Sequence, residues 1–132
     1  FANPHIQIAT LVKPMDDLSL IQDPNKVKVT RALSGKALYF SRLPIPFVRD
    51  AQCATPTYFQ HLGIYAYRNK TLQNLIQLQP SELENSEKLE QLRWLENGFD
   101  IYTALCHYEG IGIDTPEDLQ RVQAMLNSHE TK

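Results

Sequence analysis

Two arginines in the middle of this 132-residue chain have side chains suited to binding an acidic small molecule. Arg42 and Arg49 bracket a proline-rich segment, and Ser41 directly precedes the first of them. Guanidinium groups bind carboxylates through paired hydrogen bonds, so two on one loop could hold an anionic ligand. The alternative is that both are solvated loop charges, and their positions alone do not exclude it.

A histidine and a tyrosine form a second candidate group. His61 and Tyr65 lie four residues apart in a segment typical of a strand, so both should point to the same face. An imidazole and a phenol on one face could line a pocket for a polyol. A half-exposed histidine beside a packed tyrosine would explain the pattern equally well.

Glu90 and Gln91 lie on an expected helix that is otherwise rich in leucine. Glu87 and Glu90 are three residues apart and share a helix face. A solvated acidic face is the ordinary explanation, and pairing of Glu90 with Arg93 would be enough to account for it.

Asp114 is the candidate metal ligand. It follows the apolar residues 111–113 and precedes Thr115-Pro116, a strong helix start. Ligands of α/β sheets bind where strands end. A single carboxylate suits Mg²⁺, which takes one or two carboxylates together with water and substrate phosphates. The alternative is that Asp114 helps to satisfy the free N–H groups of the helix.

Other chemistry is weakly represented. Cys53 could act as a nucleophile only if the fold brought His61 to it, and Cys106 and His107 should face opposite ways in an extended segment. Neither glycine-rich phosphate-binding motif, G-x-G-x-x-G or G-x-x-x-x-G-K-[ST], is present.

Composition narrows the class of protein. The formal net charge of −2 argues against nucleic-acid binding, which needs a basic excess. No apolar run approaches the roughly 20 residues of a membrane-spanning helix, and the first residues do not resemble a signal peptide. Two isolated cysteines favour a reducing compartment, so we expect a cytoplasmic protein, although a single disulfide between them is possible.

Strand and helix patterns alternate along most of the chain. Strands are expected at 6–13, 27–30, 37–40, 62–67 and 101–105. Helices are expected over 18–21 with Asp16 as cap, around 72–76, over 82–95 between a Ser81 capping box and Gly98, and from Pro116 onward. The pattern predicts one domain of α/β class, with a largely parallel sheet and an antiparallel hairpin around Ser34-Gly35.

The strand at 6–13 is apolar on both faces, as in the middle of a parallel sheet. If only one neighbour followed it, this strand would present an unpaired edge that invites pairing with another chain. The segment at 42–56 contains three prolines and should be a long, functional loop.

Taken in order, five segments resemble one family, the 3-deoxy-manno-octulosonate (Kdo) cytidylyltransferases or CMP-Kdo synthetases. The segments read ALYFSR at 37–42, IP at 45–46 with RD at 49–50, HLGIYAYR at 61–68, LEQLR at 89–93 and GIDTPEDL at 112–119. The resemblance runs from about residue 6 to about residue 125. It implies a nucleotide-diphospho-sugar-transferase-like (Rossmann-like) fold, of which this chain would be part.

The resemblance also implies an activity. The reaction is CTP + Kdo → CMP-Kdo + pyrophosphate with Mg²⁺, and it serves lipopolysaccharide biosynthesis. Asp114 would be the metal ligand and thereby a catalytic residue. The family's sugar-acid pocket corresponds to Arg49, His61, Tyr65, Glu90 and Gln91, with Arg42 and Ser41 close by.

The main departure from the family is an absence. Its amino-terminal strand and phosphate-gripping loop, which bind CTP, have no counterpart here, so residues 1–132 are expected to be a carboxy-terminal half-domain that is inactive alone. The family is dimeric, and we expect a homodimer. Two alternatives stay open: another sugar-acid cytidylyltransferase, such as a CMP-sialic acid synthetase, and a non-catalytic sugar-binding or dimerisation module.

Overall fold

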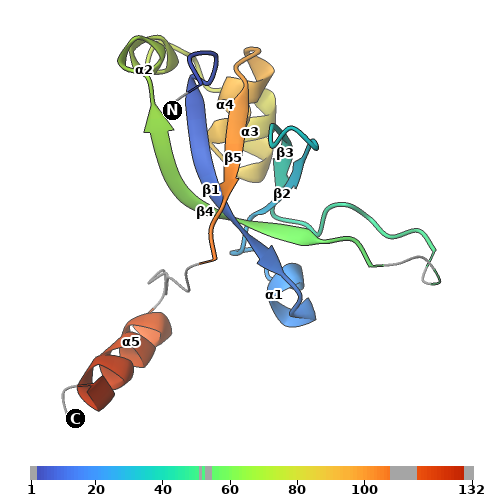
Figure 1. Ribbon diagram of the computed structural model, residues 1–132, viewed down its shortest axis with the longest axis vertical. Coiled ribbons are helices and arrows are strands. Elements are labelled where there is room, and N and C mark those ends of the chain that lie inside the picture. Colours follow the sequence, from blue (N-terminus) through green and yellow to red (C-terminus); the bar gives the residue numbers. More distant parts are fainter. Residues whose placement is uncertain (1–2, 51, 53–54, 108–115, 130–132) are drawn as a thin grey trace.

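The computed structural model describes residues 3–50, 52, 55–107 and 116–129, and for 125–129 the backbone only (Figure 1). Five strands form one sheet in the order β3-β2-β4-β1-β5. The strands are β1 (Ile8–Met15), β2 (Lys28–Arg31), β3 (Ala37–Ser41), β4 (Tyr58–Tyr67) and β5 (Ile101–Leu105). The helices are α1 (Leu18–Gln22), α2 (Asn69–Leu75), α3 (Glu82–Glu87), α4 (Gln91–Glu96) and α5 (Pro116–His129).

Strand β1 lies inside the sheet, antiparallel to β4 and parallel to β5. The expectation of an unpaired edge at this strand is wrong, because two later segments supply both of its neighbours. The edges are β3 and β5. Even β5 is partly covered, since the tip of the β2–β3 hairpin reaches it and the Gly35 carbonyl accepts the Thr103 N–H at 2.8 Å.

The α/β class is confirmed, but the strand directions are mixed. The described strands make one parallel pairing, β1 with β5, and three antiparallel ones. The predicted preponderance of parallel strands therefore does not hold within this chain. The cause is β4, a ten-residue strand that separates β1 from the hairpin and runs against both.

Local turn chemistry sets most of the element boundaries. The β2–β3 hairpin forms as predicted, with Gly35 at a positive φ of 87°. Helix α1 also forms, but its cap is Asp17 rather than the expected Asp16. The Asp17 carboxylate accepts the Ser19 N–H at 2.8 Å, which satisfies one of the free donors of the first turn.

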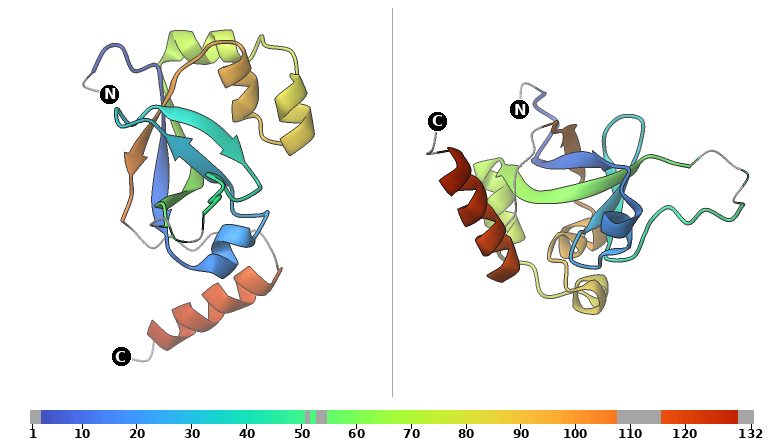
Figure 2. Two further views of the ribbon diagram at one scale, coloured as in Figure 1. Left: turned by 90° about the vertical axis from the view of Figure 1, so that its right-hand side faces the viewer. Right: turned by 90° about the horizontal axis from the view of Figure 1, so that it is seen from below.

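The single helix expected over 82–95 is two helices. Lys88 adopts the left-handed conformation with φ 54°, which ends α3, and α4 begins anew at Gln91. The predicted stop at Gly98 is confirmed by its φ of 79°. Helices α3 and α4 then pack against each other as a short hairpin beside β3 (Figure 2).

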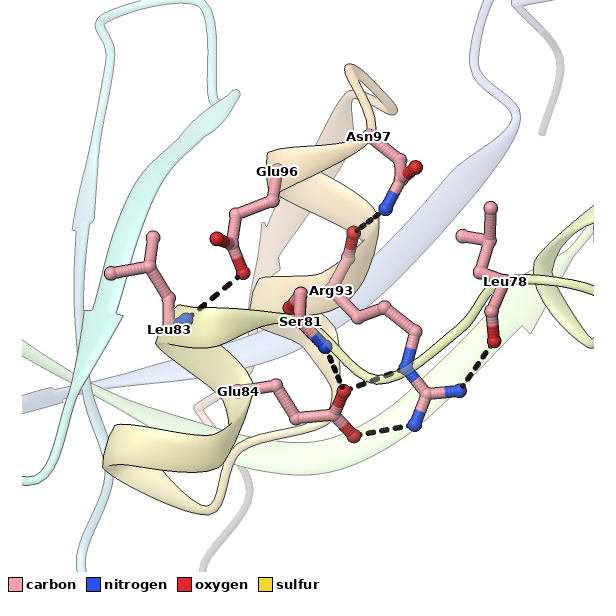
Figure 3. A network of polar contacts seen from close by, with 7 residues as sticks. All are labelled: Leu78, Ser81, Leu83, Glu84, Arg93, Glu96 and Asn97. Atoms are coloured by element: carbon pink, nitrogen blue, oxygen red, sulfur yellow. Dashed lines mark hydrogen bonds and ion pairs between the residues drawn. The ribbon is translucent and has the colours of Figure 1, made fainter.

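A polar network holds this helical hairpin together (Figure 3). The Arg93 guanidinium on α4 donates to both carboxylate oxygens of Glu84 on α3, and also to the Leu78 carbonyl at 3.2 Å. Glu84 in addition accepts the Ser81 N–H at 3.2 Å, as in the predicted capping box. Arg93 and Glu84 are mostly buried, so one carboxylate secures both the start of α3 and the contact between the helices.

One hydrophobic core lies between the sheet and α4. Its fully buried members include Ile8 and Val12 on β1, Phe40 on β3, Leu92 on α4 and Ile101 on β5. Helix α5, predicted from Pro116 onward, is confirmed, and it lies apart from the sheet (Figure 1). No helix in the described ranges has the length and apolar character needed to cross a membrane.

The Glu84–Arg93 contact generates a prediction about stability. Glu84→Gln keeps the shape of the side chain but removes the charge, so we expect the free energy of unfolding to fall by about 1–2 kcal/mol. The lowered pKa of Glu84, caused first by its hydrogen bond to Arg93, adds a pH dependence. The stabilisation should be present at neutral pH and be lost as pH falls through the folded-state pKa.

Urea unfolding at pH 7 measures this effect. Glu82→Gln is the matched control, because Glu82 is an exposed acid in the first turn of the same helix. An equal loss of stability in both variants would contradict the assignment.

Candidate functional site

Five aromatic rings from two strands and one helix lie in contact on one side of the sheet. The centroid of the His61 ring lies 5.0 Å from that of Phe40 and 5.2 Å from that of Tyr65. The Tyr65 ring in turn lies 5.0 Å from Trp94 and stacks on Tyr67 at 5.7 Å. We call these five residues the aromatic cluster.

The contact between His61 and Tyr65 depends on an irregularity in β4. In a regular strand, residues four apart are separated by roughly 13 Å along the chain. Here Thr10 pairs with Tyr65 and Val12 pairs with His61, so three residues of β4, 62–64, lie opposite the single residue Leu11. Gly63 within this bulge has a φ of 70°, which glycine adopts without strain. The bulge shortens the strand and brings the two rings together.

Thr10 on β1 binds both the bulge and the histidine. Its hydroxyl donates to the Ile64 carbonyl at 2.7 Å and lies 2.9 Å from His61 Nε2. Thr10 is buried, with only 2% of its surface exposed. Burial lowers the pKa of His61 to about 4, so this imidazole is neutral near pH 7.

Tyr65 has the least satisfied polar group of the cluster. Its hydroxyl is buried and has no hydrogen-bond partner among the described residues. Burial raises the pKa of Tyr65 well above its ordinary value, with smaller contributions from Tyr67 and Glu90. The tyrosine is therefore protonated and carries a donor for which this part of the chain provides no acceptor.

Glu90 and Gln91 lie at the start of α4, beside the cluster. The Glu90 charge raises the pKa of Tyr67 as well, after the effect of burial, which places this carboxylate near both tyrosines. Glu90 is exposed, whereas Gln91 is 94% buried beside Leu92. The structure therefore brings together four of the predicted site residues: His61, Tyr65, Glu90 and Gln91.

Ser41 and Arg42 lie in a neighbouring polar group that anchors the turn before α4. The Glu87 carboxylate accepts the Ser41 hydroxyl at 2.7 Å and the Arg42 N–H at 2.9 Å. The Arg42 guanidinium donates to the carbonyls of Glu87 at 2.7 Å, Pro24 at 3.0 Å and Lys88 at 3.3 Å. Arg42 thus binds the main chain at the end of α3, and its predicted contact with a substrate stays a prediction.

The structure changes the expected partners of two charged residues, Arg93 and Glu87. Arg93 pairs with Glu84 rather than with Glu90. Glu87 is not part of a solvated acidic face but binds Ser41 and Arg42. Glu90 has no ion pair within the described ranges, although its charge contributes to raising the pKa of Arg93 after the larger effect of Glu84.

Arg49 is exposed, and the segment 43–50 that carries it leads away from the sheet (Figures 1 and 2).

Asp114, the predicted metal ligand, lies outside the described residues, as does Cys53. Cys106 has a free thiol. Within the described ranges, no three His, Cys, Asp or Glu side chains gather as a metal site.

The sequence analysis missed several buried polar residues, among them Thr10 and Lys28. Thr10 is hidden in an apolar run, where nothing in the sequence distinguishes it from a packing residue. Lys28 is completely buried on β2, and its ammonium donates to the Asp23 carbonyl at 2.8 Å. Burial lowers the pKa of Lys28, and the Asp23 and Glu87 charges partly oppose this effect.

Two surface hollows lie away from the aromatic cluster. One of about 260 Å³ is lined by residues that include His5, Asn97 and Asp100. Another of about 790 Å³ is lined by residues that include Met15, Ile21 and Tyr58. Neither hollow includes a member of the aromatic cluster, Glu90 or Gln91.

Comparison with known proteins finds relatives that share one name. A 3-deoxy-manno-octulosonate cytidylyltransferase of Cytophaga hutchinsonii is 48% identical over 124 residues, which cover 90% of this chain and 50% of that protein. A protein of the same name from Acidobacterium capsulatum is 49% identical over 126 residues, which cover 96% of this chain and 51% of that protein. The chain therefore spans about half the length of the curated relatives it matches.

Comparison with solved structures agrees with the sequence comparison. The solved structure of a CMP:2-keto-3-deoxy-manno-octonic acid synthetase complexed with CTP superposes with a TM-score of 0.87 at 41% sequence identity. The match covers 97% of this chain and 52% of that one. A family model described as cytidylyltransferase matches residues 1–101, more than half of the chain. On these matches, the chain belongs to the cytidylyltransferase family.

Proposed function

We propose that this chain supplies the sugar-acid-binding part of an enzyme that joins CTP and Kdo to give CMP-Kdo and pyrophosphate, a step of lipopolysaccharide biosynthesis. The names of its relatives and of its structural neighbour support this reaction. The chain covers about half of each of these proteins.

The buried Tyr65 hydroxyl, which has no hydrogen-bond partner among the described residues, is the observation that carries the proposal. Leaving a buried hydroxyl without a partner costs about 1–3 kcal/mol. It lies here beside a neutral histidine, and the charge of Glu90, which has no ion pair within the described ranges, acts on it. A ligand rich in hydroxyl groups would satisfy all three, and Kdo is an anionic polyol.

Each side chain has a distinct part in the proposed pocket. His61, Tyr65, Glu90 and Gln91 exchange hydrogen bonds with sugar hydroxyls. Arg49, whose guanidinium is exposed, is the proposed partner of the sugar carboxylate, with Ser41 and Arg42 nearby. Gln91 is held rigidly because it is buried, which favours a fixed orientation of its amide.

The proposed reaction is an in-line displacement. The anomeric oxygen of Kdo forms a bond to the α-phosphorus of CTP, and the bond to the β-phosphate oxygen breaks to release pyrophosphate. The pocket residues contribute by fixing the position of the attacking hydroxyl. Orientation of this kind supplies much of the acceleration of a bimolecular reaction.

Mg²⁺ is the proposed cofactor, with Asp114 as its ligand and therefore as a catalytic residue. A single carboxylate is sufficient when water and phosphate oxygens complete the coordination. When bound, Mg²⁺ would neutralise charge on the CTP phosphates.

We further propose a cytoplasmic homodimer with no nucleic-acid or membrane partner. The net charge of −2 and the small number of cysteines support this setting. Dimerisation rests on the family resemblance, because the paired state of β1 removes the argument from an open strand edge.

Tyr65→Phe should separate binding from folding. Because the lost hydroxyl has no partner, we expect the free energy of unfolding to stay unchanged or to rise by up to about 1 kcal/mol. Affinity for Kdo, measured by NMR titration of the chain, should fall about tenfold.

Tyr39→Phe is the control, because Tyr39 is a half-buried tyrosine on β3 that is not a member of the aromatic cluster. If both variants bound Kdo as tightly as the unmodified chain, Tyr65 would have no role in the pocket.

His61 should give the chain a pH-dependent stability. Its pKa is about 4 in the folded state against an ordinary value of 6.5, so the unfolded chain binds the proton first. Stability should be complete above about pH 6.5 and should fall by on the order of 3 kcal/mol as pH drops to about 4. Urea unfolding at pH 7 and pH 4.5 measures this loss.

His61→Gln should show a smaller loss of stability between these two pH values, because glutamine does not titrate. The control is His5→Gln, which replaces an exposed histidine and should leave the pH dependence as it was. The same pH dependence in all three proteins would refute the assignment to His61.

Substrate choice tests the activity itself. For the full-length enzyme that carries this chain, we expect kcat/KM with Kdo to exceed that with N-acetylneuraminate by at least about 100-fold, because the hydroxyls of the two sugars meet the pocket differently. Pyrophosphate release in the presence of CTP is the measurement. Preference for N-acetylneuraminate would favour a CMP-sialic acid synthetase, and Kdo binding with no turnover would favour a sugar-binding module.

A further inference from the structure

The Thr10 hydroxyl lies between one obligate acceptor and one ring nitrogen. The Ile64 carbonyl, 2.7 Å away, can only accept a hydrogen bond. His61 Nε2, 2.9 Å away, can either donate or accept. A hydroxyl has a single proton, so the two contacts together decide its direction.

The proton of Thr10 must point to Ile64. If it pointed to His61 instead, two oxygen atoms without a proton between them would lie 2.7 Å apart in a partly buried contact. With the Thr10 proton given to Ile64, the hydroxyl oxygen has to accept from His61. The proton of the neutral imidazole is therefore on Nε2.

The other ring nitrogen is then a free acceptor. No contact from the described residues occupies His61 Nδ1, and the neutral state of the ring leaves a lone pair on it. We infer that Thr10 is a positioning residue that fixes the Nε2–H tautomer of His61, so that Nδ1 accepts a hydrogen bond from a ligand hydroxyl. The second half of this inference rests on the proposed function.

The arrangement has a consequence for specificity. Tyr65, whose hydroxyl is protonated and unpartnered, offers a donor, while His61 offers an acceptor on the same side of the sheet. The two residues together fit a ligand with neighbouring hydroxyl groups, each of which can both donate and accept. A ligand that lacks the donor opposite His61 would leave Nδ1 unpaired and should bind less tightly.

The tautomer can be read directly by ¹⁵N NMR of the histidine rings in the unmodified chain. We expect His61 Nε2 to have the shift of a protonated, pyrrole-type nitrogen and Nδ1 that of a bare, pyridine-type nitrogen. Thr10→Ser keeps the hydroxyl and should preserve this signature. Thr10→Val removes it and should shift the population toward the Nδ1–H form.

Thr103→Val is the matched control. Thr103 is the register partner of Thr10 on the adjacent strand, is also buried, and also makes hydroxyl hydrogen bonds, to Gly35 and Arg31. The Thr103→Val variant should lose stability as Thr10→Val does, but the ¹⁵N shifts of the His61 ring should stay unchanged. A Nδ1–H signature in the unmodified chain would overturn the inference, whether or not Thr10→Val folds.

Titration with Kdo tests the second half. We expect Thr10→Val to weaken binding about tenfold and Thr10→Ser to restore it, because the loss of one neutral hydrogen bond is of that size. Equal affinity in all three proteins would overturn the role of Nδ1. If the unmodified chain bound no Kdo, the proposed function and this role would both fail, while the tautomer measurement would stand independently.

Discussion

A single hydroxyl, that of Thr10, stabilises the irregular segment on which the candidate site depends. The bulge at residues 62–64 removes the Ile64 carbonyl from the regular ladder, and a partly buried carbonyl without a partner is costly. Thr10 satisfies it and at the same time orients the His61 ring. Strand β1 is hydrogen-bonded on both sides, to β4 and to β5, so Thr10 has little freedom to move. Its hydrogen bond to Ile64 therefore holds the bulge in place.

The bulge in β4 brings aromatic side chains of this strand into contact with one another. In a regular β4, His61 and Tyr65 would lie too far apart for their rings to meet. Shortened, β4 gathers His61 and Tyr65 beneath Trp94, and the resulting apolar surroundings change their chemistry. The same burial keeps His61 neutral and Tyr65 protonated. Both residues therefore act as hydrogen-bonding groups whose protonation state does not change near neutral pH.

A second device positions Glu90 and Gln91. The left-handed Lys88 breaks what would be one helix and redirects the chain, so that α4 presents Gln91, Leu92 and Trp94 to the core. Left-handed backbone is unfavourable for a lysine. The Arg42 guanidinium offsets this by binding the carbonyls of Glu87 and Lys88, and Glu84 fixes the other end of α3 through Arg93. Polar contacts thus set the angle between two short helices that have few core residues of their own.

The sequence by itself determined the strands, the hairpin, the start of α3 at Ser81, the helix stop at Gly98 and the family, because these follow from local periodicity, turn chemistry and ordered motifs. It also predicted that His61 and Tyr65 share a face. Only the tertiary structure decided that both neighbours of β1 come from later segments, that Glu87 binds Ser41 and Arg42, and that Thr10 contacts His61. These pairings join residues more than 40 positions apart, and their partners are chosen by packing, which no local pattern records.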